Sequence, residues 1–262
     1  MNYGTPEMPI VNIDQLAGLL SPDSLPRKAS RSASHLQSTL VPTVSWRDHR
    51  VEAHGQAIPK DEMGGDLVDL HATDSEVTAY VADVSGHGLR AGFLMGMLKT
   101  AMRYGLHLGQ PLAKVLDQIN LVLPAVKEAA MYATLSALRF DGSNEVEYLS
   151  AGHVPLLHYR RRTGDVVRYG MDQFPLGLFQ GFSYASRRIP YEAGDLFGLV
   201  TDGIVETGID RDAVFGLDRV AQILRDLAAY PLEQIYEVAH DAVKRYGSQE
   251  DDQSILLVRA LA

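Results

Sequence analysis

The stretch Glu76–Leu106 reads EVTAYVADVSGHGLRAGFLMGMLKTAMRYGL and contains the sharpest change of pattern in the chain. Its first part, Glu76–Val84, is rich in β-formers and predicts a strand. Its last part, Leu89–Leu106, has apolar residues on nearly every face and predicts a mostly buried helix. Between them, Gly86–Gly88 supplies two glycines that permit sharp backbone angles. Asp83 therefore lies where a strand ends and a helix is about to begin.

Three other acidic turns also lie beside apolar, strand-like runs: Gly64-Gly65-Asp66-Leu67-Val68-Asp69, Thr201-Asp202-Gly203-Ile204 and Asp251-Asp252-Gln253-Ser254. Carboxylates from such turns can converge on one point although they are distant in the chain. Like charges held a few ångströms apart would force one group to take up a proton unless a cation lay between them. The pattern predicts a divalent-metal site. Hard oxygen ligands and the absence of cysteine favour magnesium or manganese over zinc or copper.

Each acidic turn also has a purely structural interpretation, as a charged or glycine-rich loop. Asp66 and Asp69 are three residues apart and cannot share one face of a strand, so we expect only one to face the ion. Asp66, beside the glycines, is the predicted ligand. His87 and His153 are candidate substrate contacts, and a hydrogen-bonded structural histidine is the alternative for each.

Composition narrows the class of protein. The 262 residues are 46% hydrophobic, which is enough for one large domain. The absence of cysteine excludes a cysteine nucleophile and agrees with a reducing, cytoplasmic location. A net charge of −9 argues against nucleic-acid binding. No leader pattern and no run of about 18 apolar residues is present, so we expect no membrane association.

The chain divides at about residue 45. Residues 1–45 are polar and turn-rich and predict an arm or linker with a short helix near 35–41, whereas residues 46–262 predict the folded, catalytic domain. Further strands are expected at Val51–Ile58, Gly65–His71, Met131–Phe140, Glu145–Ser150, Pro155–Arg160, Val166–Tyr169, Tyr184–Ile189, Leu196–Thr201 and Ser254–Ala260. Further helices are expected at Pro111–Val122, Leu217–Ala228 and Pro231–Tyr246. Short turns between strands favour antiparallel pairing, in two sheets packed face to face with helices outside.

Taken in order, the motifs resemble those of the PPM superfamily of metal-dependent serine/threonine phosphatases, in particular its bacterial SpoIIE and RsbU-like branch. The matching motifs include the four acidic turns, with Glu206 following Thr201-Asp202-Gly203-Ile204. The others are Met131-Tyr132-Ala133-Thr134, Ala151-Gly152-His153-Val154-Pro155, Pro175-Leu176-Gly177 and Phe215-Gly216. The resemblance runs from about residue 36 to the end of the chain. It implies an α+β fold, a four-layer αββα sandwich of two mainly antiparallel sheets.

The resemblance also implies a centre of two manganese or magnesium ions that hydrolyses phosphoserine or phosphothreonine with a metal-activated water. Asp83 would bridge the ions and the Val84 carbonyl would bind one of them. The remaining implied ligands are Asp66, Asp202 and Asp251. Alignment favours Asp251 over Asp252, so Asp252 is expected just outside the ligand set. For Asp69, ligation and a place outside the ligand set or at the surface both stay open. A third ion occurs in some relatives and is not placed here.

By the same resemblance, we expect the substrate to be a phosphorylated bacterial regulatory protein, an anti-sigma-factor antagonist. The segment His35–Pro42 resembles the helical linker of relatives and is expected to contact a regulatory protein or a second copy. Leu67 and Val68 stand where relatives have aromatic residues, and Val154 where they have proline. Two alternatives therefore stay open: a catalytically silent binding module of this fold, and a two-metal hydrolase of small phosphoesters.

Overall fold

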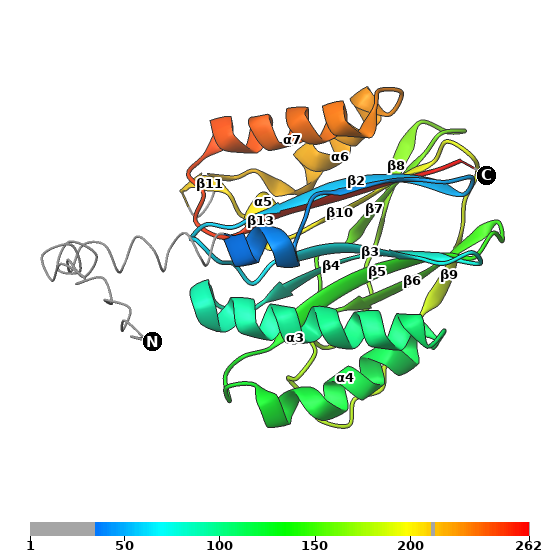
Figure 1. Ribbon diagram of the computed structural model, residues 1–262. Coiled ribbons are helices and arrows are strands. Elements are labelled where there is room, and N and C mark those ends of the chain that lie inside the picture. The colour runs from blue at the N-terminus through cyan, green and yellow to red at the C-terminus, as the bar shows by residue number, and fades with distance from the viewer. Residues whose placement is uncertain (1–34, 211–212, 262) are drawn as a thin grey trace, which may run out of the picture.

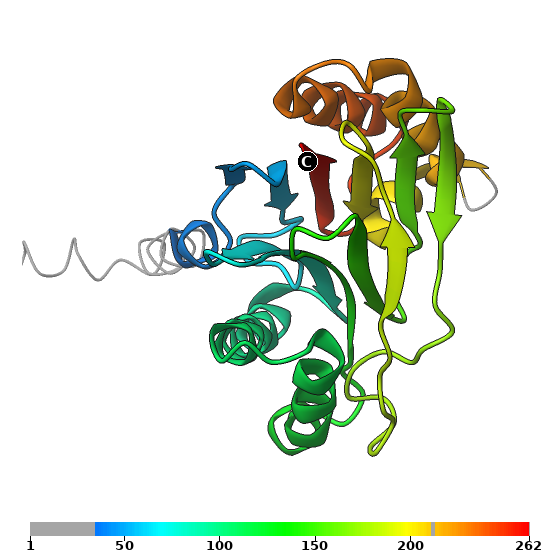
Figure 2. The same cartoon turned by 90° about the vertical axis from the view of Figure 1, so that its right-hand side faces the viewer.

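The computed structural model describes residues 35–210 and 213–261, and it forms four layers (Figures 1 and 2). Two sheets lie face to face in the middle. One outer layer holds α3 (Gly88–His107) and α4 (Leu112–Val126), and the other holds α6 (Gly216–Leu227) and α7 (Leu232–Tyr246). The predicted α+β fold, a four-layer αββα sandwich, is confirmed.

Both sheets are antiparallel throughout. The larger sheet has the order β1 (Val44–Arg47), β2 (Val51–Ile58), β13 (Gln253–Ala260), β10 (Leu196–Val200), β7 (Leu156–Arg160) and β8 (Asp165–Tyr169). The smaller sheet has the order β3 (Leu67–Ala72), β4 (Val77–Val84), β5 (Ala133–Phe140), β6 (Glu145–Ala151) and β9 (Arg187–Pro190). β13, the last strand of the chain, lies between β2 and β10 in the middle of the larger sheet. It begins at the edge of the sandwich where β4 ends.

Several short elements were not predicted from the sequence: β1, the helix α5 (Asp202–Val205), and the pair β11 (Gly208–Asp210) and β12 (Ala213–Val214). Each is too short to show a period of its own. Residues 35–40 are helical, and residues 1–34 of the predicted arm lie outside the described residues. In the described part of the chain, no helix is both long and apolar enough to cross a membrane.

Burial explains why β4 shows no alternation of polar and apolar residues. The strand lies between β3 and β5, and the two faces of its sheet are covered by α3 and by the larger sheet, so seven of its eight residues are buried. The sheets are joined by aromatic packing: Phe140 of β5 and Phe197 of β10 meet edge to face with ring centroids 5.6 Å apart. A second apolar cluster lies between the larger sheet and α6 and α7.

The helix predicted over Leu89–Leu106 is present as α3, but it is not mostly buried. Leu94, Leu98 and Met102 face the smaller sheet, whereas Phe93 is 60% exposed and Tyr104 is 68% exposed. The prediction was wrong because apolar residues occupy both faces of α3, and sequence alone does not say which face meets solvent.

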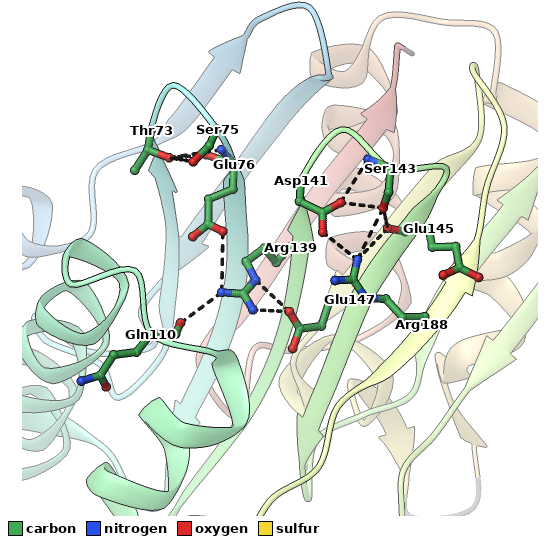
Figure 3. Close-up of polar contacts among 10 residues, drawn as sticks. All are labelled: Thr73, Ser75, Glu76, Gln110, Arg139, Asp141, Ser143, Glu145, Glu147 and Arg188. Carbon is green, nitrogen blue, oxygen red and sulfur yellow. Dashed lines mark hydrogen bonds and ion pairs between the residues drawn. The ribbon is translucent and has the colours of Figure 1, made fainter.

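Arg139 connects neighbouring strands of the smaller sheet at the edge where β4 begins (Figure 3). Arg139 of β5 donates from Nε to Glu147 Oε2 on β6 at 2.7 Å and from Nη1 to the Gln110 carbonyl at 3.0 Å. Its Nη1 also lies 3.7 Å from Glu76 Oε2. The side chains of Arg139 and Glu147 are only 12% and 7% exposed, so each neutralises the other in a poorly solvated place.

We predict that Arg139→Met lowers the free energy of unfolding by about 3–5 kcal/mol, because it leaves Glu147 buried without its hydrogen-bonded cation. The double variant Arg139→Met/Glu147→Leu should recover most of this loss, since it removes both charges. Chemical denaturation measures both effects. The matched control is Arg90→Met, which breaks an exposed pair with Glu128 and should cost less than about 1 kcal/mol. Equal losses for Arg139→Met and Arg90→Met would contradict the assignment.

Candidate metal centre

The fold brings the acidic turns to one edge of the sandwich. Asp83 is the next-to-last residue of β4, and Asp66 immediately precedes β3, which pairs antiparallel with β4. In the larger sheet, β10 ends just before Asp202, and β13 begins just after Asp251-Asp252. Val200 pairs with Ile255, so these two turns are neighbours. Antiparallel pairing within each sheet therefore places strand ends and strand starts side by side.

Asp66 connects the two sheets. It is 2% exposed, and its Oδ2 accepts hydrogen bonds from Thr201 Oγ1 at 2.8 Å and Ser254 Oγ at 2.6 Å, both from the larger sheet. Burial, followed by repulsion from Asp83 and Asp252, raises the pKa of Asp66 well above its usual value. The hydroxyl donors Thr201 and Ser254 stabilise the charged form and only partly oppose this rise. Neither was singled out from the sequence, although both lie within the acidic motifs.

Asp83 lies where the negative charges meet. Burial raises its pKa to about 7, with further contributions from Asp202, Asp251, Asp252 and Glu206. The pKa of Asp202 is raised as well, first by burial and then by repulsion from Glu206 and Asp251. Glu206 was absent from the predicted site residues. Its spacing of four from Asp202 across a short helix is the sequence signal that could have identified it.

Asp251 and Asp252 are adjacent but have different surroundings. Asp252 is 3% exposed, and its carboxylate accepts backbone N–H groups from Lys60 and Gly65, each at 2.7 Å. These bonds hold the Gly64–Gly65 turn in place. Asp251 is exposed and accepts only the N–H of Asp252, at 2.8 Å, among its hydrogen bonds to described residues. The arrangement favours Asp251 as the carboxylate available to an ion.

Asp69 faces away from the cluster. Burial alone would raise its pKa, but hydrogen bonds from Arg103 and Tyr80 hold the pKa below its usual value. Arg103 donates to both carboxylate oxygens, at 2.7 and 2.6 Å, and Lys99 Nζ lies 3.3 Å away. Because Arg103 and Lys99 belong to α3, Asp69 fastens β3 to that helix.

Glycine lets the first acidic turn approach the end of β4. A Cβ at Gly65 would lie 2.5 Å from the Val84 carbonyl oxygen, so only glycine fits without a shift. The following turn uses positive φ angles of 90° at Gly86 and 74° at Gly88, which L-residues with side chains rarely adopt. The Val84 carbonyl is thereby left at the edge, beside Asp83.

The two candidate histidines differ in exposure. The His87 side chain is 65% exposed and its Nδ1 lies 2.9 Å from Asp61 Oδ2, at the entrance to the α3 helix. His153 Nδ1 lies 2.7 Å from Thr134 Oγ1, and its Nε2 is buried without a hydrogen-bond partner among the described residues. Its burial favours a role inside the fold, whereas His87 can reach a bound molecule.

The chemistry of this cluster fits a divalent cation. Asp66, Asp83 and Asp202 all have raised pKa values because negative charge is gathered there without a compensating cation from the described side chains. Carboxylate and carbonyl oxygens are the ligands that magnesium and manganese prefer. Among the described residues, no group of three His, Asp or Glu side chains is arranged so that it could hold a metal ion as it stands. The fit therefore rests on the donor types and on the repulsion that a cation would relieve.

Comparison with known proteins supplies the family. Residues 73–261 match the family described as Stage II sporulation protein E (SpoIIE). The chain belongs to the SpoIIE family. Its fold is that of the PPM-type phosphatases, which confirms the resemblance drawn from the motifs. Phosphoserine phosphatase RsbU of Bacillus subtilis (strain 168) is 24% identical over 227 residues, which are 86% of this chain and 68% of RsbU.

Solved structures share the fold of this SpoIIE-family chain. The SiaA-PP2C domain of Pseudomonas aeruginosa has a TM-score of 0.77 and 20% identity, and the match covers 95% of this chain and 99% of that domain. The RsbU and RsbW domains of Rv1364c from Mycobacterium tuberculosis have a TM-score of 0.73 and 24% identity, over 85% of this chain and 62% of that chain. The SpoIIE-family chain thus spans less than two thirds of the Rv1364c structure.

We predict that the metal-free SpoIIE-family protein loses stability as the pH rises from 5 to 8. The pKa of Asp83 is about 7 in the folded state and near 3.8 when unfolded, so the folded state binds more protons between these values. The contribution of Asp83 to the free energy of unfolding must then fall with rising pH, until Asp83 is ionised in both states. Asp83→Asn should flatten this dependence and raise the stability at pH 8 by roughly 1–4 kcal/mol.

Urea denaturation in a chelator at both pH values measures this effect. Asp226→Asn, at an exposed position of α6, is the matched control and should leave the pH dependence unchanged. A pH dependence that is equally steep in the wild type and in Asp83→Asn would contradict the repulsion assigned to Asp83.

Proposed function

We propose that the protein is a metal-dependent phosphatase that hydrolyses phosphoserine or phosphothreonine on a regulatory protein. The observation that carries this proposal is the carboxylate cluster of buried Asp66 and half-buried Asp83 and Asp202, built from both sheets of a SpoIIE-family fold. Such a cluster is unstable by itself and suits chemistry that adds positive charge at the same point.

The residues available to hold two divalent ions are Asp83 with the Val84 carbonyl, and Asp66, Asp202 and Asp251. When bound, such ions lower the pKa of a water and neutralise the charge of a phosphoryl group in transfer. Support for the metal type comes from two solved structures of this fold, RsbX in complex with magnesium and the catalytic domain of PstP in complex with 2 manganese ions. A third ion has no assigned ligands here.

Other side chains of this chain would orient the groups. Thr201 and Ser254 fix Asp66 by donating to one of its oxygens, which leaves its other oxygen for an ion. His87 lies at the exposed side with its Nδ1 2.9 Å from Asp61 Oδ2, and it is the side chain proposed to contact the substrate. No cysteine occurs in the chain, so a phosphocysteine intermediate is excluded.

The proposed substrate class is a phosphorylated bacterial regulatory protein of the anti-sigma-factor-antagonist type, in the cytoplasm. RsbU is named a phosphoserine phosphatase, which supports a phosphoserine substrate for this relative of it. The absence of cysteine is in keeping with a reducing compartment.

A regulatory protein or a second copy of the chain would contact the N-terminal segment. Leu36 and Leu40 of the helical residues 35–40 line an apolar recess of about 600 Å³ together with Phe93, Met97 and Tyr104 of α3. The exposure of this apolar surface supports an interface there.

We predict that the purified protein releases phosphate from a phosphoserine protein only when manganese or magnesium is present. Asp83→Asn and Asp202→Asn should each lower kcat by more than about 100-fold, since loss of a ligand exceeds the effect of losing an outer partner. Phosphate release over time measures the rate, and Asp241→Asn serves as the unaffected control.

Phosphate release, together with calorimetric manganese binding, distinguishes this function from the two alternatives. A silent binding module would bind manganese in calorimetry and release no phosphate from any substrate. A hydrolase of small phosphoesters would act faster on metabolite phosphates than on the phosphoprotein. Either result would contradict the proposed function.

A further inference from the structure

His153 occupies a turn whose backbone is fixed by close packing. The preceding residue, Gly152, has a φ of 63°, and a Cβ there would lie 2.6 Å from the Pro175 ring. Leu176, which follows Pro175 in the chain, exchanges two backbone hydrogen bonds with Ala133, of 3.0 and 2.7 Å. The turn at Gly152–His153 is therefore held beside the start of β5, at the edge that carries the acidic cluster.

One ring nitrogen of His153 reaches the strand next to Asp83. Its Nδ1 lies 2.7 Å from Thr134 Oγ1. Thr134 is the direct partner of Asp83 in the antiparallel pairing of β4 and β5. Side chains directly opposite each other on such strands share a face, with Cβ atoms about 4.5–5.5 Å apart. Thr134 is thus the neighbour of Asp83 across the ladder.

The ring also lies beside the larger sheet. Nε2 is buried and makes no hydrogen bond of normal geometry, but the backbone of Val200 at the end of β10 is close enough to affect the ring. Val200 is two residues before Asp202. One imidazole therefore lies between the strand beside Asp83 and the strand that leads to Asp202.

The protonation state of the ring sets the direction of its hydrogen bonds. Burial lowers the pKa of His153 to about 4, and the Val200 backbone opposes this only in part, so the ring is neutral at pH 7. A neutral ring carries one N–H, and a carbonyl such as that of Val200 can only accept. With the proton on Nε2, Nδ1 accepts the hydroxyl proton of Thr134. The Thr134 hydroxyl is then the donor of this hydrogen bond, and the lone pairs of Oγ1 take no part in it.

We propose that His153 is a positioning residue: through Thr134 and Val200 it fixes the spacing of Asp83 and Asp202, and thereby sets the affinity of the site for a divalent cation. The inference rests on the proposed metal centre and adds a residue that does not itself touch the ion. The partners that orient metal ligands typically change metal affinity by about 10–100-fold when they are lost.

The test is calorimetric titration of the full chain with manganese alone, without substrate. His153→Leu and Thr134→Val should each weaken manganese binding by about 10–100-fold. His153→Asn keeps an acceptor near the position of Nδ1 and should recover most of the affinity that His153→Leu loses. Thr134→Val preserves shape and keeps the test available if His153→Leu does not fold.

His158→Leu is the matched control. His158 is fully buried, its Nε2 lies 2.8 Å from Asp195 Oδ2, and it belongs to β7 away from the acidic edge. It should lower the melting temperature and leave the manganese affinity unchanged. If His153→Leu and Thr134→Val behave in this way too, the positioning role is overturned.

Asp83→Asn distinguishes a failure of the proposed metal centre from a failure of the role proposed for His153. If it binds manganese as tightly as the wild type, the metal centre itself is wrong. If it loses manganese while Thr134→Val binds normally, the metal centre stands and the role of His153 falls.

Discussion

Repulsion among carboxylates gathered at one edge of two sheets is the constraint on which the rest of the structure depends. Asp66 and Asp83 come from the smaller sheet, and Asp202 and Asp251 from the larger one. Asp66 is held by Thr201 and Ser254 of the opposite sheet, so the sandwich can close at this edge only with the charges together. The glycine at position 65 and the buried Asp252 serve the same closure, because they let the backbone turns approach. The proposed ions would supply the missing positive charge.

Much of this arrangement follows from local sequence. Strand runs that end in Asp-Gly or Gly-Gly turns place the carboxylates at strand ends, and short hairpin turns make the sheets antiparallel. Since antiparallel neighbours return to the same edge, the sequence alone predicts that Asp83 and Asp202 lie close together. The motif order then identified the family, and the SpoIIE match agrees with it.

The rest depended on partners that are distant in the chain. Nothing near Asp69 reveals that Arg103 and Lys99 of α3 hold it, and nothing near Asp252 reveals the N–H groups of Lys60 and Gly65. The exposed face of α3 was missed for a related reason, since its apolar residues lie on both sides of the helix. His153 is the clearest case, because its two neighbours belong to different sheets.

An anomalous difference map from crystals grown with manganese would locate the ions relative to the carboxylates. We expect peaks within bonding distance of Asp83 and Asp202, with the Asp251 carboxylate and the Val84 carbonyl on the same ions, and Asp252 still bonded to Gly65. A map without a manganese peak at Asp83, in crystals where the four layers are intact, would contradict the proposed metal centre.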